Sequence, residues 1–255
     1  MNSSVTDVAV TAACLLDGKL ILRQPARGHR VGTDTMLLAG CLAELGPLVV
    51  DAGAGVGGVG LAVALRAPQS QVRLIERQPD LAALAQENVS ANGLTDRVDV
   101  LSCDLLSAAA RRASGLGNAG ASAVLTNPPF YEADSVRASP HDGRAQAHVL
   151  GEGGLEAWMR ACLALLAPGG RFAMIHRPQS LKAALEACEG RLGALRVLPI
   201  LPRAGQDAGR IVLSGRKGSR AALAIAAPFV VHEADGRFTA AAEAIHRGEA
   251  LLVRE

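Results

Sequence analysis

The stretch LVVDAGAGVGG at residues 48–58 decides the fold class of this 255-residue chain. Its three leading apolar residues predict a strand, and the glycines after Asp51 predict a tight loop that opens a helix. Glycines let the backbone approach a ligand closely, and the N–H groups at a helix start favour an anionic group. A loop in this position is the place where open parallel sheets bind ligands.

Short apolar runs alternate with helical segments after this loop. Further strands are predicted at residues 72–75, 98–101, 123–126 and 171–176, and helices are predicted from Asp80 to Asn92-Gly93 and over residues 155–166. This alternation is typical of an α/β protein with a parallel sheet covered by helices on both faces. Residues 197–201, 210–214 and 221–226, and a turn at Asp235-Gly236, predict a more strand-rich end.

The segment before the loop predicts a β-hairpin and a helix. The apolar residues 14–16 and the run Lys19-Leu20-Ile21-Leu22 flank Asp17-Gly18, a strong short hairpin signal. Thr33 and Asp34 are good N-caps for a helix over residues 35–45. With no linker in view, we expect one domain over residues 1–255, in which residues 1–46 form the hairpin and helix and residues 47–255 form the core.

Composition limits the class of protein. Hydrophobic residues make up 49% of the chain and charged residues 20%, as in ordinary globular proteins. No apolar run approaches the roughly 20 residues of a membrane span, and the start lacks a basic signal-peptide region, so we expect a cytoplasmic protein. The five cysteines have no metal-binding spacing, which favours reduced thiols and no metal site. A net charge of +2 does not decide whether nucleic acid is a partner.

Three acids follow or end three successive predicted strands: Asp51, Glu76 and Asp104. Glu76 can accept both hydroxyls of a ribose, and Asp104 can receive the amino group of an adenine. The loop also satisfies the G-x-G-x-x-G dinucleotide fingerprint, so an NAD-dependent oxidoreductase is an alternative. A carboxylate two residues before the first glycine, as Asp51 is, would repel a pyrophosphate but suits an ammonium group. The three acids together therefore favour a cationic, adenine-bearing cofactor.

The turn Asn127-Pro128-Pro129-Phe130 closes the predicted strand at 123–126. Proline fixes φ and lacks an N–H, so the turn is stiff and presents carbonyl oxygens. The Asn127 side-chain oxygen and the Pro128 carbonyl can each accept a hydrogen from an amino group, which positions its nitrogen and raises its electron density. Phe130 and Tyr131 offer a stacking face for a base. A rigid turn beside a core aromatic is the structural alternative.

Basic residues are concentrated near the C-terminal strands. Between residues 196 and 220 only Asp207 is acidic, and the excess fits contacts to phosphates. The cluster consists of Arg203, Arg210, Arg216, Lys217 and Arg220. A solvated basic loop and strand edge would have the same composition. The aromatic Trp158 lies on an apolar helix face and is predicted to be core.

Taken in order, the glycine loop, the acids and the Asn-Pro-Pro-Phe turn resemble the class I methyltransferases that modify amino groups. The segments QPARGHRVGTD at residues 24–34, LAPGGR at 166–171 and PILPR at 199–203 resemble more narrowly the bacterial tRNA1(Val) adenine-N6-methyltransferases. This resemblance implies a Rossmann-like sheet of seven strands with the last antiparallel. It also implies S-adenosylmethionine as cofactor, RNA (most simply tRNA) as partner, and transfer to the exocyclic N6 amino group of adenine.

The resemblance further implies which residues form the site. The Asn127–Phe130 turn would be catalytic, and Tyr131 and the basic cluster would contact RNA. Cofactor-binding residues would be Gly32, Asp34, Asp51, Gly53, Gly55, Gly57, Glu76, Arg77, Asp104, Leu105 and Asn127. Enzymes that methylate protein glutamine at N5 carry similar turns and remain an alternative, as do small-molecule methyltransferases and an RNA-binding protein with a degenerate site.

Overall fold

The computed structural model describes residues 9–27, 30–117, 119–129 and 154–252. Its centre is a nine-stranded sheet, whose strands are β3 (Leu48–Ala52), β4 (Gln71–Glu76), β5 (Val98–Ser102), β6 (Ala121–Thr126), β7 (Leu166–His176), β8 (Leu192–Arg203), β9 (Arg210–Lys217), β10 (Ala224–Ile225) and β11 (Phe229–His232). The apolar runs predicted as strands from residue 48 onward lie in this sheet, whereas the N-terminal hairpin forms a separate two-stranded sheet.

The strand order is β5-β4-β3-β6-β7-β9-β8, with β10 and β11 both paired to the outer edge of β8. Strand β9 is antiparallel to β7 and β8, and the other strands between β5 and β7 pair in parallel. The expected mostly parallel sheet is confirmed, and β9, the seventh strand in chain order from β3, is its antiparallel member. The sheet has nine strands rather than the expected seven, because β10 and β11 add in parallel to the edge of β8, so the antiparallel strand is not the last. A dinucleotide-binding sheet ends in a sixth parallel strand, whereas here an antiparallel strand is inserted next to β7.

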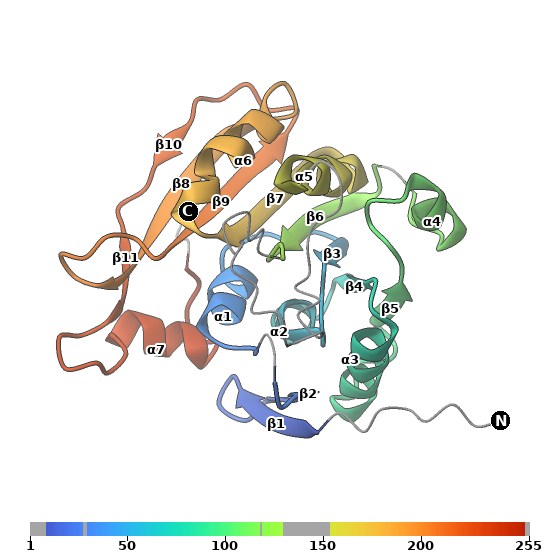
Figure 1. The fold of residues 1–255 in the computed structure, drawn as a ribbon, viewed down its shortest axis with the longest axis horizontal. Helices are drawn as coiled ribbons and strands as arrows, with labels where there is room; N and C mark the ends of the chain where they lie inside the picture. The colour runs from blue at the N-terminus through green and yellow to red at the C-terminus, as the bar shows by residue number, and fades with distance from the viewer. Residues whose placement is uncertain (1–8, 28–29, 118, 130–153, 253–255) are drawn as a thin grey trace, which may run out of the picture.

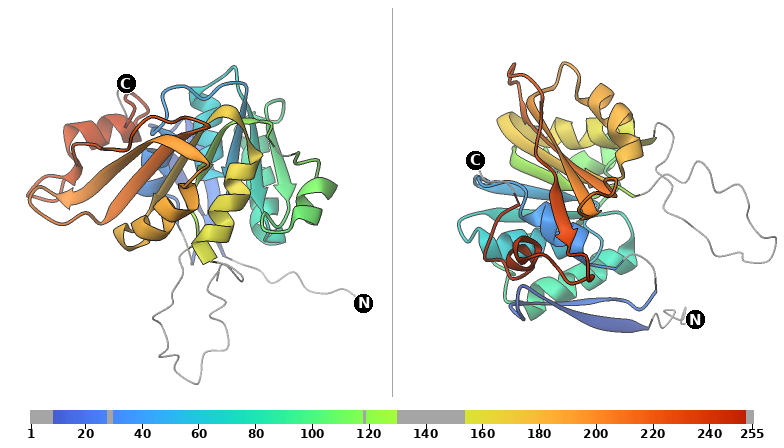
Figure 2. Two further views of the ribbon diagram at one scale, coloured as in Figure 1. Left: turned by 90° about the horizontal axis from the view of Figure 1, so that it is seen from above. Right: turned by 90° about the vertical axis from the view of Figure 1, so that its left-hand side faces the viewer.

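Helices cover both faces of the sheet (Figures 1 and 2). On one face lie α1 (Thr33–Ala39), α2 (Gly58–Arg66) and α3 (Pro79–Ala91). On the other lie α5 (Gly154–Leu165) and α6 (Leu181–Cys188), preceded by the short η1 (Pro178–Ser180). Each face has its own apolar core. Helices α4 (Ala108–Ala113) and α7 (Ala240–His246) lie at opposite ends of the sheet. No described helix could span a membrane.

The N-terminal hairpin is confirmed and lies against α2 and α3, at the foot of the view in Figure 1. It is formed by β1 (Val10–Leu15) and β2 (Leu20–Pro25). The turn has four residues, because Leu15 pairs with Leu20. Leu16 and Asp17 as well as Gly18 have positive φ, so Asp17-Gly18 is only part of the turn.

Some expected boundaries are wrong. Helix α1 begins after Gly32, whose carbonyl accepts the N–H of Thr35, so neither Thr33 nor Asp34 is the N-cap. It ends at Ala39 rather than near residue 45, because the Gly40 carbonyl bonds to the N–H of Leu252 instead of continuing the helix. Helix α3 is preceded by Gln78, not capped by Asp80, and α6 and α7 were not predicted.

Candidate active site

The carboxyl ends of four adjacent strands bring the predicted site together. Ala52 at the end of β3 lies opposite Ile75 on β4 and opposite Thr126 on β6. Glu76 lies opposite Ser102, the last residue of β5. Because these strands are parallel, the segments that follow them meet at one edge of the sheet. The glycine loop, the acids after β4 and β5 and the Asn127 turn are therefore neighbours, as the sequence predicts.

The glycine loop passes over this edge with positive φ at Gly53, Gly55 and Gly57. A Cβ on Gly53 would come within 2.9 Å of the Trp158 ring, and one on Gly57 within 2.9 Å of Leu74. Among the described residues, nothing lies within 4 Å of the Cβ position of Gly55. The first and third glycines are thus required by internal packing, whereas Gly55 faces open space where a ligand can approach the backbone.

The Glu76 carboxylate holds the glycine loop by a hydrogen bond. It is 6% exposed, and its Oε2 accepts the N–H of Gly55 at 2.9 Å while its Oε1 accepts the N–H of Gln78 at 2.8 Å. An ionised carboxylate has about four acceptor positions, so two remain for hydroxyl donors. This arrangement fits the predicted role of Glu76 in holding a ribose.

Asp51 lies under the loop and is 2% exposed. Its Oδ2 accepts the N–H of Gly60 in the first turn of α2 at 2.8 Å. Burial raises the pKa of Asp51 from 3.8 to about 7; the Gly60 hydrogen bond opposes the shift and the Glu76 charge adds to it. A buried carboxylate with such a pKa gains from a nearby cation. The contact of Asp51 with the ammonium group of a cofactor stays a prediction.

Gly60 is a site residue that the sequence reasoning missed. A Cβ there would lie 2.1 Å from the Leu74 side chain and 3.2 Å from Asp51, so only glycine lets α2 approach the sheet closely enough to bond Asp51. The signal in the sequence was a second glycine, Gly60, two residues after Gly58 at the start of the predicted helix. The G-x-G-x-x-G fingerprint ends at Gly58 and does not include this position.

The residues that follow β4 and β5 lie at the same carboxyl edge, on the side of β3 away from β6. Asp104 is exposed, and its Oδ1 accepts the N–H of Leu106 at 2.9 Å, which leaves its other oxygen for a ligand amino group. Arg77 is exposed beside Glu76. Leu105 is 1% exposed and packs in the core beneath α5, so it supports this loop from inside.

The Asn127 turn is held by two hydrogen bonds at the end of β6. The Thr126 hydroxyl donates to the Ala52 carbonyl at 2.8 Å and accepts the Trp158 Nε1–H at 3.0 Å. Trp158 is buried, as predicted, but it also packs against Gly53 and so joins the turn to the glycine loop. Asn127 and Pro129 are half-buried and Pro128 is buried. Phe130 and Tyr131 lie outside the described residues.

The start of α1 packs against the start of α2. A Cβ added at Gly58 would lie 3.0 Å from the Val31 side chain and 3.1 Å from the Thr35 side chain. This places Gly32 near the loop, as predicted. Asp34, two residues further in the first turn of α1, forms an ion pair with Arg210 on β9, with 2.8 Å between Oδ2 and Nε. Asp34 thus joins the cofactor side of the sheet to its C-terminal half.

The structure divides the basic cluster between two edges. Arg203 ends β8 and Arg210 begins β9, so both lie at the carboxyl edge. Arg216 and Lys217 end β9 at the opposite edge, level with the starts of β7 and β8, and Arg220 follows them. The Lys217 amine donates to the carbonyls of Leu163 and Leu166, and Arg216 donates to the carbonyl of Gly169. These last three basic residues lie away from the site.

A strand order with an antiparallel seventh strand, a glycine loop after the first strand and acids after the next two define a class I methyltransferase. The chain matches the methyltransferase small domain model over residues 28–186 and belongs to that family. Its cofactor is accordingly S-adenosylmethionine.

Named relatives divide between two substrates. A tRNA1(Val) (adenine(37)-N6)-methyltransferase of Porphyromonas gingivalis is 32% identical over 67% of this chain and 69% of its own length. A release factor glutamine methyltransferase of Moorella thermoacetica is 28% identical over 62% of this chain and 56% of its own length.

Solved structures agree with the fold. One, described as a predicted O-methyltransferase of Agrobacterium tumefaciens, has a TM-score of 0.73 and 32% identity and covers 87% of this chain and 99% of that one. A 16S rRNA methyltransferase of T. thermophilus, solved with its methyl donor and guanosine, has a TM-score of 0.56 at 22% identity over 82% of this chain and 50% of that one.

Proposed function

We propose that this chain methylates the exocyclic N6 amino group of an adenine in RNA, with tRNA as the substrate. When bound, S-adenosylmethionine supplies an electrophilic methyl group on a sulfonium. The open space at Gly55 and the buried Glu76 beside it support cofactor binding at the carboxyl edge. The observation that carries the proposal is that the Asn127 turn begins beside this loop, where Thr126 bonds to Ala52.

The chain's own contribution to transfer is positioning and polarisation. The lone pair of an amino nitrogen on a purine is delocalised into the ring, so this nitrogen is a weak nucleophile. The Asn127 side-chain oxygen and the Pro128 carbonyl would each accept one of its hydrogens, which holds the nitrogen and increases its electron density. Stacking of the base on Phe130 or Tyr131 would contribute roughly 1–3 kcal/mol. The nitrogen then loses one proton to solvent as it gains the methyl group.

Phosphate contacts are assigned to Arg203 and Arg210, because only these members of the basic cluster lie at the carboxyl edge. Relatives named as tRNA adenine methyltransferases support RNA as the substrate. Relatives named as release factor glutamine methyltransferases favour a second candidate, transfer to a glutamine amide, whose amino nitrogen needs the same two acceptors.

One experiment separates these candidates. The purified chain is incubated with methyl-labelled S-adenosylmethionine and, in parallel, total tRNA, total protein from ribosome-associated fractions, or a small-molecule extract. We expect label in tRNA, and N6-methyladenosine after digestion to nucleosides. Label in protein alone would instead establish the glutamine candidate. Label only in the small-molecule pool, or in no pool while S-adenosylhomocysteine still binds, would remove both.

A further inference from the structure

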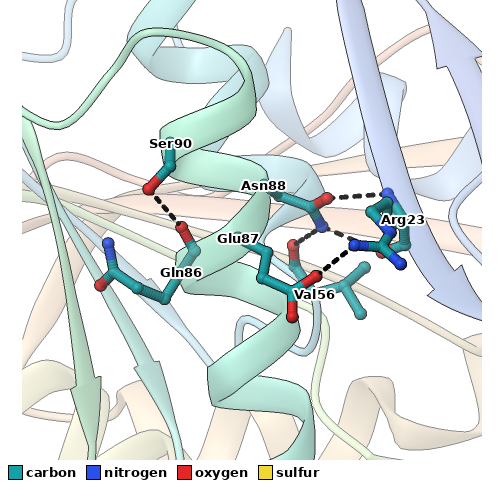
Figure 3. A network of polar contacts seen from close by, with 6 residues as sticks. All are labelled: Arg23, Val56, Gln86, Glu87, Asn88 and Ser90. Atoms are coloured by element: carbon teal, nitrogen blue, oxygen red, sulfur yellow. Dashed lines mark hydrogen bonds and ion pairs between the residues drawn. The ribbon is translucent and has the colours of Figure 1, made fainter.

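Asn88, a residue of α3 outside the predicted site, is completely buried. The backbone N–H and C=O groups of α3 bond to one another within the helix. The buried Asn88 amide therefore needs hydrogen-bond partners from other elements. A buried amide that is left without hydrogen-bond partners destabilises the folded chain. Asn88 finds three partners on two elements: the backbone N–H and carbonyl of Arg23 on β2, and the carbonyl of Val56 in the glycine loop (Figure 3).

The bonds to β2 imitate a neighbouring strand. Asn88 Oδ1 accepts the Arg23 N–H at 2.7 Å and Nδ2 donates to the Arg23 carbonyl at 2.9 Å, the exchange that pairs two antiparallel strand residues. Asn92, one turn further along α3, repeats the exchange with the N–H and carbonyl of Ile21 at 3.0 and 2.8 Å. Four helix residues advance about 6 Å and two strand residues about 6.8 Å, so the two amides match alternate residues of β2.

Only Asn88 also reaches the glycine loop. Its second amide hydrogen goes to the Val56 carbonyl at 3.0 Å, while the N–H on the other side of that peptide, from Gly57, donates to the Ala54 carbonyl at 2.8 Å. The peptide between Val56 and Gly57 is therefore fixed from both sides. It directly precedes α2, in a loop whose glycines are otherwise free to adopt many conformations.

We propose that Asn88 is a positioning residue for the methyl-donor site: it holds the glycine loop in its binding conformation and joins that loop to the N-terminal hairpin. Glu76 fixes the loop at Gly55 from one side, and Asn88 fixes it at Val56 from the other. Asn92 bonds to the hairpin and to the Asn88 carbonyl of its own helix, and it makes none of the hydrogen bonds to the glycine loop. Cofactor binding and the ordering of the N-terminal hairpin are consequently coupled through the side-chain amide of Asn88.

The matched pair Asn88→Ala and Asn92→Ala tests the proposal without any methyl acceptor, so its outcome is independent of the substrate. Each variant removes one clamp on β2, and both should lower Tm. We expect the Kd of S-adenosylhomocysteine, measured by calorimetry, to rise about tenfold or more for Asn88→Ala and to stay within twofold for Asn92→Ala, since one hydrogen bond to the loop changes binding by about that factor.

Equal Kd changes in the two variants, or an unchanged Kd for Asn88→Ala, would overturn the assignment. If Asn88→Ala does not fold, Asn88→Asp keeps the volume and the acceptor for Arg23 while removing the amide donors. At pH 8 it should show the same weakened binding, and wild-type affinity in this variant would equally refute the role.

Discussion

The buried carboxylate of Asp51 should make cofactor binding depend on pH near neutrality. Its pKa of about 7 means that roughly half of the folded molecules hold this acid protonated at pH 7. If the cofactor's ammonium requires the ionised form, affinity at pH 6 should be about tenfold below its plateau above pH 8, because about one tenth of the competent form remains. Binding at pH 7 should release about half a proton.

Asp51→Asn is the matching perturbation, since the amide oxygen can still accept the Gly60 N–H but cannot ionise. The variant should bind S-adenosylhomocysteine about tenfold or more weakly at pH 8, with almost no dependence between pH 6 and 8. Calorimetry in buffers of different ionisation enthalpy gives both the affinity and the proton count. A variant that keeps the wild-type pH slope would show that another group titrates and would refute the reasoning.

The same raised pKa of Asp51 should make the stability of the fold fall as pH rises, whereas it should make cofactor affinity rise. Because the folded-state pKa of this acid is raised above 3.8, the folded protein binds more protons than the unfolded chain between pH 3.8 and about 7. The stability contributed by the protonated form is therefore lost as pH rises through that window, by a few kcal/mol at most. Asp51→Asn should be more stable than the wild-type chain at pH 8, and chemical unfolding at pH 5 and pH 8 measures the difference.

Three further outcomes follow from the site and its surroundings. Asn127→Ala should lower kcat at least a hundredfold while the Kd of S-adenosylhomocysteine stays within threefold; a variant with near-normal turnover would remove this side chain from the mechanism. Arg203→Ala should raise KM for tRNA several-fold and reduce its salt dependence, whereas Arg220→Ala at the opposite edge should change neither, and equal effects would contradict the division of the basic cluster. Of the five cysteines, all within the described residues and all free, only Cys14 is exposed, so a thiol reagent should modify one equivalent rapidly in the native chain and five after unfolding; several fast equivalents would contradict the buried positions.

The sheet could be predicted from the sequence because its signals are local. The apolar run before Asp51 and the alternation of strands and helices required no long-range information. The end of α1 was missed because it depends on Leu252, more than two hundred residues away, whose N–H bonds to Gly40. Helix α7 was missed because its residues 240–246 carry only two buried apolar positions, Ala242 and Ile245.

The position of a residue at the carboxyl edge could be predicted where a residue type and a strand end coincide, as at Glu76 and Asn127, whose roles stay predictions. Positions were missed where a residue acts through a contact that spacing does not reveal. Trp158 was assigned to the core for its apolar helix face, and only its position against Gly53 and Thr126 shows what it supports. Asn88 is a polar residue in the middle of a helix, which the sequence alone would leave in solvent.

The sheet order explains why two distinct parts of the chain can meet at one place. Strand β3 has β4 on one side and β6 on the other, so the strand order reverses at β3. In open α/β sheets, ligands bind between the loops at such a reversal point. The groups suited to the cofactor come from β3, β4 and β5, and the Asn127 turn comes from β6. Thr126 and Trp158 join the two parts, because Thr126 bonds to Ala52 and Trp158 packs on Gly53. The donor side can therefore keep its conformation while the loops of the acceptor side change to suit a different amino group, and relatives with two different substrates are expected from this architecture.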